Sequence, residues 1–124
     1  MPFLAANDRH VSAVELQALV SRERILIALD EGTACGWLRW SLFWDDIPFM
    51  NMLFVLPSHR RRGIGKDLVI VWEESCRANG HAMVLTSTLV TESAQHLYRH
   101  LGFQDVGHLD LPGEARELIL LHRI

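Results

Sequence analysis

A cluster of cations and glycines stands in one short segment of the sequence, just after an apolar run that ends at Pro57. Its members are Arg60, Arg61, Arg62, Gly63, Gly65 and Lys66. Helical periodicity begins at about Gly65, and the first N–H groups of a helix have no internal partner while its dipole places positive charge there. Glycines let a bulky anion approach the backbone closely. The segment therefore predicts a site for a phosphate or pyrophosphate group.

Spacing excludes two common phosphate-binding motifs. A Walker A loop needs a serine or threonine after its lysine, but Asp67 follows Lys66. A dinucleotide fingerprint needs a third glycine where this sequence has Leu68. Two other interpretations of the cluster stay open. It could be an exposed basic turn, or it could contact a nucleic acid, although the net charge of -3 disfavours the latter.

Metal and disulfide chemistry find little support in the sequence. His96 and His100 have a spacing that suits a metal on one helical face, but no third ligand is evident, so we expect no metal site. Cys35 and Cys76 cannot form a disulfide framework, which is typical of a reducing compartment. No apolar run reaches the roughly 20 residues of a membrane span, and no signal peptide is evident. We expect a cytoplasmic protein that binds neither membranes nor nucleic acids.

The pattern of apolar residues, caps and turns predicts the elements that position these groups. Helices are expected over 13–21, 65–79 and 92–101. Strands are expected over 25–29, 34–43, 49–56, 83–88, 103–109 and 117–122. The mostly apolar strand 49–56 should lie at a central, buried position. Residues 1–124 are thus predicted to form one domain of the α+β (α/β) class, with a mixed, mostly antiparallel sheet flanked by helices.

Two segments together resemble a known family. The first is R-x-x-G-x-G at Arg60, Gly63 and Gly65, in the context V-x-P-x-x-R-R-x-G-I-G-x-x-L. The second matches a helix and turn of the same family at Ala94, Leu97, Tyr98, Gly102 and Phe103, with Thr91 where asparagine is usual. Both resemble the GNAT superfamily of N-acetyltransferases, and the stretch 42–54 resembles that of a subgroup of small bacterial members.

The resemblance implies the GNAT fold, with one departure. Family domains open with a strand and a longer first helix, whereas only about eleven residues precede the helix expected after Ser12. We therefore expect the usual first strand to be missing. An exposed sheet edge would result, and exposed edges invite pairing with another chain. A homodimer could cover that edge.

The resemblance also implies acetyl-CoA as co-substrate and a set of residues that hold it. Matching positions assign pantetheine and the thioester carbonyl to the backbone of Leu53, Phe54 and Val55. The backbone N–H groups assigned to the pyrophosphate belong to Arg61, Arg62, Gly63, Ile64, Gly65 and Lys66. Arg60 would neutralise phosphate charge, and Thr91 stands at a cofactor position. Tyr98 matches the tyrosine that commonly protonates the departing thiolate, or it is a tyrosine that simply packs on the core.

The residues that would contact the amine acceptor are less evident in the sequence. Family members often place a glutamate near the start of the strand 49–56, but this sequence has no carboxylate there. Asn51 could orient a water, with Met50 and Met52 on the opposite face. Other candidates for contact with the acceptor are the loop residues Trp44, Asp45 and Asp46 and the strand residues Thr86 and Ser87. The two aspartates could attract an ammonium group or serve the turn alone.

Three functions are compatible with these residues. The first is transfer of an acetyl group from acetyl-CoA to a primary amine, by direct attack in a ternary complex. The acceptor would be a small molecule or a peptide, with the acidic balance favouring a cationic small molecule. The second is a non-catalytic acyl-CoA-binding sensor or partner module, which the missing base and short N-terminus favour. The third is a basic-loop binding protein unrelated to CoA.

Overall fold

A computed structural model describes residue 3 and residues 23–124 of the chain. The helix expected over 13–21 and the expected absence of the first strand both lie outside the described residues. Within them, every expected element from residue 25 onward is present, with ends displaced by one or two residues. The strands are β1 Ile25–Asp30, β2 Thr33–Phe43, β3 Ile47–Val55, β4 Met83–Leu89, β5 Gln104–Leu109 and β6 Glu117–Arg123.

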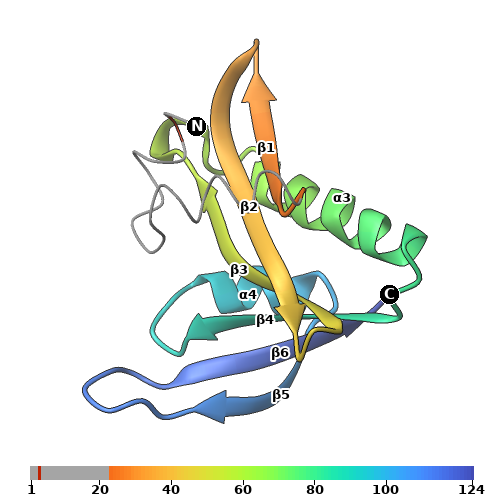
Figure 1. The fold of residues 1–124 in the computed structure, drawn as a ribbon. Helices are drawn as coiled ribbons and strands as arrows, with labels where there is room; N and C mark the ends of the chain where they lie inside the picture. Colours follow the sequence, from red (N-terminus) through yellow and green to blue (C-terminus); the bar gives the residue numbers. More distant parts are fainter. Residues whose placement is uncertain (1–2, 4–22) are drawn as a thin grey trace.

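These six strands form one sheet in the order β1-β2-β3-β4-β6-β5 (Figure 1). Every neighbouring pair is antiparallel except β3 with β4, which run parallel. The expected mixed, mostly antiparallel sheet is therefore confirmed. The central position expected for the third strand is also confirmed, since β3 lies between β2 and β4.

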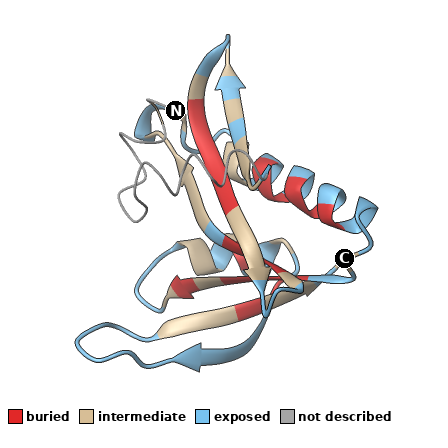
Figure 2. Ribbon diagram, viewed as in Figure 1, coloured by how far each residue is buried: buried red, intermediate tan, exposed pale blue. Residues whose placement is uncertain are grey.

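Two helices cover one face of the sheet. The longer, α3 (Ile64–Ala78), packs across β1, β2 and β3, and the shorter, α4 (Ala94–His100), packs on β4. Burial of Leu68, Val69, Trp72 and Cys76 on α3 confirms the apolar stripe that the period of 3.6 predicts. These side chains join those of β2, β3, β4 and β6 in one core cluster, and Figure 2 shows buried positions gathered between α3 and the strands.

The parallel contact between β3 and β4 is short, and this opens the sheet. Only Phe49 with Leu85 and Met50 with Thr86 are paired across the two strands. Beyond these pairs β3 continues to Val55 and β4 to Leu89, and Figure 1 shows the two strands diverging. The edge of β3 that faces the opening therefore presents backbone groups that pair with no other described strand. For this reason the second half of β3 is only half-buried, although it is central.

A β-bulge in β3 changes which side chains face the opening. The register against β2 shifts at one point, because Arg39 pairs with Met52 while the next residue, Trp40, pairs with Met50. Asn51 is thus the extra residue of the bulge. The expectation that Met50 and Met52 share a face is wrong for this reason. Met50 packs in the core with α3, whereas Met52 packs against the cluster around Trp37 on the other face.

Candidate active site

A cavity of 440 Å³ lies where β3, the basic loop and the first turn of α3 meet, and we call it the loop cavity. This cavity is lined by nine of the residues that were predicted to bind the pyrophosphate and pantetheine groups: Leu53, Phe54, Val55, Arg60, Arg61, Gly63, Ile64, Gly65 and Lys66. Two predicted residues, Arg62 and Thr91, are not part of this lining. Three others that sequence reasoning missed line it, namely His59, Ser93 and Leu97.

The backbone at the start of α3 is shaped to receive an anion. Gly63 caps the helix with φ 79°, a left-handed conformation that favours glycine. The first helical hydrogen bond runs from the Asp67 N–H to the Gly63 carbonyl at 2.9 Å, so the N–H groups of Ile64, Gly65 and Lys66 precede the helical ladder. A Cβ added to Gly65 would stand 3.8–3.9 Å from side chains of β3 and α4, inside the cavity. The glycine therefore keeps this floor open.

The cationic side chains of the basic loop make different contacts. The Arg60 Nε donates to the Val55 carbonyl at 2.9 Å, and its guanidinium lies 5.5 Å from the Phe54 ring centroid. Arg62 reaches Asp30 at 3.4 Å, and the His59 Nε2 reaches the same carboxylate at 3.0 Å. These contacts fasten the loop to β3 and to the end of β1. They leave Arg61 and Lys66 as cations at the cavity wall that make none of these contacts.

A second cavity, of 510 Å³, lies in the opening between β3 and β4, and we call it the central cavity. It shares Leu53 with the loop cavity, so the two adjoin. The structure brings four of the predicted chemical residues together in its wall: Asn51, Thr86, Ser87 and Tyr98. Asp45 and Asp46 lie on the exposed turn between β2 and β3 and line neither cavity. The Asn51 side chain donates to the Ser41 hydroxyl at 2.7 Å.

Tyr98 is the buried acid of the central cavity. Its side chain projects from α4 and is only 5% exposed. Burial raises the pKa of the phenol to about 12, with a further increase from the negative charge of Glu92, while a hydrogen bond with Thr86 opposes the shift. Thr86 in turn donates to the Met50 carbonyl at 3.1 Å. The phenol is therefore fixed against β3 and β4 and stays protonated at neutral pH.

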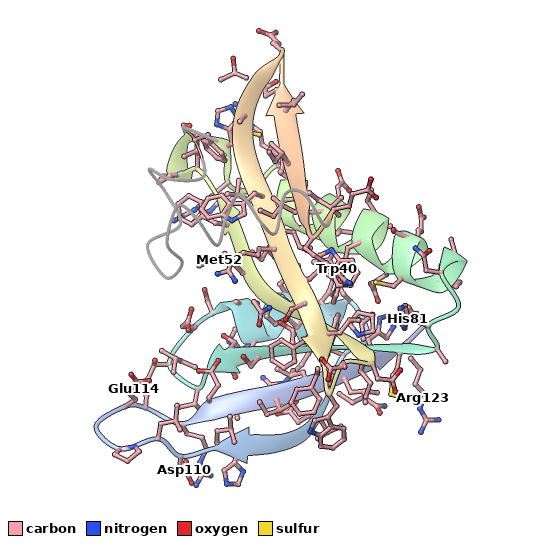
Figure 3. The ribbon with its side chains drawn as sticks, in the orientation of Figure 1. Trp40, Met52, His81, Asp110, Glu114 and Arg123 are labelled. Atoms are coloured by element: carbon pink, nitrogen blue, oxygen red, sulfur yellow. The ribbon has the colours of Figure 1, made fainter. Side chains whose placement is uncertain are left out.

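Three glutamates complete the central cavity, and sequence reasoning assigned none of them to the site. Glu92 precedes α4, while Glu114 and Glu117 belong to the β5–β6 hairpin, and Figure 3 shows Glu114 on the loop of that hairpin. Glu92 is already engaged, since it accepts the Leu89 N–H at 3.1 Å. Glu117 is half-buried opposite Leu89, and its carboxylate has no hydrogen-bond or ion-pair partner among the residues that the structure describes.

One buried hydroxyl in the central cavity is also unsatisfied. The Thr88 Oγ1 has no hydrogen-bond partner within the described part of the chain, although the residue is only 4% exposed. A buried polar atom without a partner is destabilising and is uncommon in folded proteins. Thr88 is therefore suited to bind a polar group that enters this cavity.

Comparison with known proteins identifies the arrangement. The family model described as the acetyltransferase (GNAT) domain matches residues 21–105, which is more than half of the chain. The chain belongs to the GNAT family. Acetyl transfer is the activity of this family, and acetyl-CoA is the co-substrate. A comparison with curated proteins gave no match.

Solved structures place the same fold in several acetyltransferases. Ard1 from Thermoplasma volcanium superposes with a TM-score of 0.83 at 16% identity, over 97% of this chain and 86% of that one. The ribosomal-protein-alanine N-acetyltransferase from Brucella melitensis gives 0.79 at 22% identity, over 95% and 82%. A crystal structure of the NatC complex bound to Gag peptide and CoA gives 0.78 at 20% identity, over 92% and 80%. At these identities the similarity shows the fold.

The GNAT loop of this chain fits the diphosphate of acetyl-CoA on its own geometry. Ile64, Gly65 and Lys66, whose N–H groups precede the helical ladder, line the loop cavity, Gly65 leaves the floor open, and Arg61 and Lys66 supply positive charge. The free edge of β3 beyond Met50 offers amide groups to an extended, amide-containing tail. The described residues hold no group of three or more potential metal ligands and no helix able to span a membrane.

Both cysteines of this GNAT domain are buried, and we predict that they resist thiol reagents until the chain unfolds. Cys35 and Cys76 are each 1% exposed, and burial, reinforced by the charge of Glu73, raises the pKa of the Cys76 thiol to about 11. A thiol that is both protonated and inaccessible is a poor nucleophile. Titration with Ellman's reagent should show almost no fast reaction in buffer and both thiols in urea. A fast native thiol would contradict this placement.

Proposed function

We propose that this GNAT domain is an N-acetyltransferase that transfers the acetyl group of acetyl-CoA to a primary amine, by direct attack in a ternary complex. The observation that carries the proposal is the position of Tyr98. Its protonated phenol lies in the central cavity, beside the loop cavity that suits the diphosphate, with three carboxylates in the same wall. A buried phenol and three carboxylates, with the Arg39 side chain in the same wall, thus adjoin the loop cavity at Leu53.

Binding of acetyl-CoA would use the loop cavity first. The N–H groups at the start of α3 would hold the diphosphate, with Arg61 and Lys66 neutralising its charge. The backbone of Leu53, Phe54 and Val55 would hold pantetheine along the open edge of β3. An N–H directed at the thioester carbonyl would favour the negative charge that develops there. Acetyl-CoA supplies an acyl group activated by a thiol leaving group.

Transfer then needs one proton acceptor and one proton donor. An ammonium acceptor loses a proton to a carboxylate, and its nitrogen lone pair attacks the carbonyl carbon. A C–N bond forms, the C–S bond breaks, and the Tyr98 phenol gives its proton to the departing sulfur. The nitrogen, which is positively charged after the attack, loses its second proton to solvent, and solvent restores the phenol proton. The products are an amide, a free thiol and one proton for each ammonium acceptor consumed.

Glu117 is the proton acceptor that we assign. Of the three cavity glutamates it is the one that is half-buried, and no described side chain occupies its carboxylate. Asn51, which the sequence suggested as an orienting group for water, is held by Ser41 at the same cavity wall. Proton removal by a positioned base is worth about 10²–10⁴-fold in rate.

Direct transfer is favoured over a covalent acetyl-enzyme by the state of the two thiols. Neither Cys35 nor Cys76 lines the loop or the central cavity, and both are buried. An acetyl-cysteine intermediate therefore has no accessible nucleophile to form on. Initial-rate patterns with both substrates varied should intersect, as in a sequential mechanism, whereas parallel lines would indicate a covalent intermediate.

Replacing Glu117 by glutamine should lower kcat/KM for the amine by about tenfold to a hundredfold near neutral pH, because the base is lost while shape is kept. The variant's rate should keep rising with pH towards the pKa of the amine itself, whereas the wild type should level off earlier. Glu74→Gln, on the exposed side of α3, is the matched control. Equal pH profiles in all three proteins would remove Glu117 from the mechanism.

A further inference from the structure

A third cavity, of 610 Å³, opens on the face of the sheet away from α3 and α4. It lies on this face because side chains along each strand alternate between the two faces of the sheet. Leu85 and Ile119 line it, while their neighbours Val84 and Leu120 point into the core beneath the helices. Its wall is almost wholly apolar and comes from β2, β3, β4, β5 and β6. We call it the apolar cavity.

The rim of the apolar cavity carries an unusually exposed tryptophan. Trp44 is 80% exposed, and its ring stands 4.6 Å from that of Phe43, which in turn lies 6.0 Å from Phe49. The three rings form an aromatic wall along one side of the cavity. Val106 and Leu109 of β5, also exposed, stand among the residues that line the same cavity. Covering an apolar surface of this kind with a ligand lowers the free energy of the system, because the surface is removed from water.

The backbone that holds Trp44 is strained. Trp44 and Asp45 both have left-handed conformations, with φ 56° and 58°, and the Asp46 N–H donates to the Phe43 carbonyl at 3.1 Å. A turn with two left-handed central residues strongly favours Asn-Gly, and a bulky aromatic residue there is an outlier. Folding alone therefore does not account for a tryptophan at this position. Strain of this kind is concentrated at binding and catalytic sites.

The apolar cavity adjoins the candidate reaction site, because the two cavities share lining residues. Asn51 and Ser87 line both it and the central cavity that contains Tyr98. On β6, Glu117 lines the central cavity, and Ile119, the next residue on the same face, lines the apolar one. A molecule with an ammonium group beside Glu117 would thus place its remaining atoms against the apolar wall. The carboxylate of the central cavity and the wall of the apolar cavity thus lie in the same order as the ammonium group and the apolar body of such a molecule.

We propose that the acceptor is a primary amine carried on an aromatic or branched apolar body, and that this body occupies the apolar cavity against Trp44. The proposal rests on the function proposed above and names the substrate class of that site. The shared lining argues for the acceptor rather than for a second copy of the chain, because Asn51 and Ser87 line both cavities and the central one also contains Tyr98 and Glu117. The acceptor chemistry is shared by free amines and by the N-terminus of a peptide with an apolar first residue.

A matched pair of free amines tests the proposal. Phenethylamine and ethylamine carry the same reacting group, and kcat/KM should be at least about tenfold higher for phenethylamine, since apolar pockets discriminate by roughly this amount or more. Trp44→Asn should reduce the ratio severalfold. Asparagine tolerates the left-handed backbone, so this variant should melt no lower than the wild type. Leu29→Asn, at an exposed apolar position of β1, should leave the ratio unchanged.

Binding measured without turnover separates this proposal from the proposed function. Calorimetric titration of the CoA-saturated protein should show tighter binding of phenethylamine than of ethylamine, and Trp44→Asn should weaken it. Trp44-dependent binding with no acetylation of any amine would support the cavity and overturn the acetyltransferase function. Acetylation of both amines with equal kcat/KM and equal binding would overturn the apolar acceptor and leave the function intact.

Two further experiments identify what occupies the apolar cavity. Peptides that begin with leucine or glycine show whether a preference for apolar groups belongs to free amines or to peptide N-termini, and a preference in either set supports the proposal. Sedimentation of the wild type and Trp44→Asn tests a second copy as the occupant. A dimer that the substitution dissociates, with the amine ratio unchanged, would overturn the proposal in favour of a subunit interface.

Discussion

A chain carrying Gly65→Asp should fold normally and bind acetyl-CoA at least about a hundredfold more weakly than the wild type. Gly65 has helical geometry, and a Cβ there would make only ordinary contacts of 3.8–3.9 Å. An acidic residue in the first turn of a helix favours the helix dipole, so the melting temperature should be unchanged or higher. The same carboxylate, however, would stand in the loop cavity where the diphosphate is expected. Isothermal titration with acetyl-CoA measures the loss.

The control for this prediction is Gly65→Asn, which has the same shape as aspartate without its charge. It should bind acetyl-CoA more weakly than the wild type and clearly more tightly than Gly65→Asp, because steric filling remains while repulsion is removed. ADP, which carries the diphosphate without pantetheine, should follow the same order. Equal affinities for the wild type and Gly65→Asp would show that the diphosphate binds elsewhere.

Replacing Tyr98 by phenylalanine should lower kcat by about 10²–10³-fold and leave the KM for acetyl-CoA nearly unchanged, because only proton donation to the leaving sulfur is lost. The ring remains, so its packing against Phe103 at 5.8 Å should persist. Burial raises the pKa of the phenol to about 12, so the acid stays protonated at pH values well above neutrality. The wild-type rate should therefore show no decline from loss of this proton below about pH 11.

Release of the CoA thiol, followed at saturating acetyl-CoA and amine, measures this effect. Phe103→Leu, which disturbs the same aromatic pair from the opposite side, is the control for a packing role. If Tyr98→Phe retained kcat but lowered the melting temperature as much as the control does, Tyr98 would be a packing residue and another group would protonate the sulfur.

The spacing of apolar residues and the turn residues between them were sufficient to predict the described helices and strands, because these signals lie within each segment of the sequence. The stripe of Leu68, Val69, Trp72 and Cys76 has the spacing of one helical face, and Gly80 follows the helix end. The lining of the loop cavity could largely be predicted as well, since its glycines, cations and helix start are contiguous in the sequence. Gly63 and Gly65 have the conformation and the open surroundings that such a site requires.

For the acceptor, the sequence predicted Trp44, Thr86 and Ser87, which line the central or the apolar cavity, but the other residues depend on the pairing of distant strands. Glu117 reaches the central cavity only because β6 returns beside β4 and sets this residue opposite Leu89. The alternation rule failed at Asn51, since a bulge depends on the register against β2 and leaves no local signal. Likewise, the sequence shows Trp44 in a loop but not its left-handed backbone or its place on the rim of the apolar cavity.

The most direct test of the whole account is to incubate the protein with acetyl-CoA and phenethylamine and to quantify both products. Mass spectrometry measures the acetylated amine, and a thiol reagent added after quenching measures released CoA. If this account is correct, one equivalent of free thiol accompanies each acetylated amine, and both products are reduced together in Tyr98→Phe. Tight binding of acetyl-CoA without amide formation on any amine tested, or thiol release without amide, would contradict it.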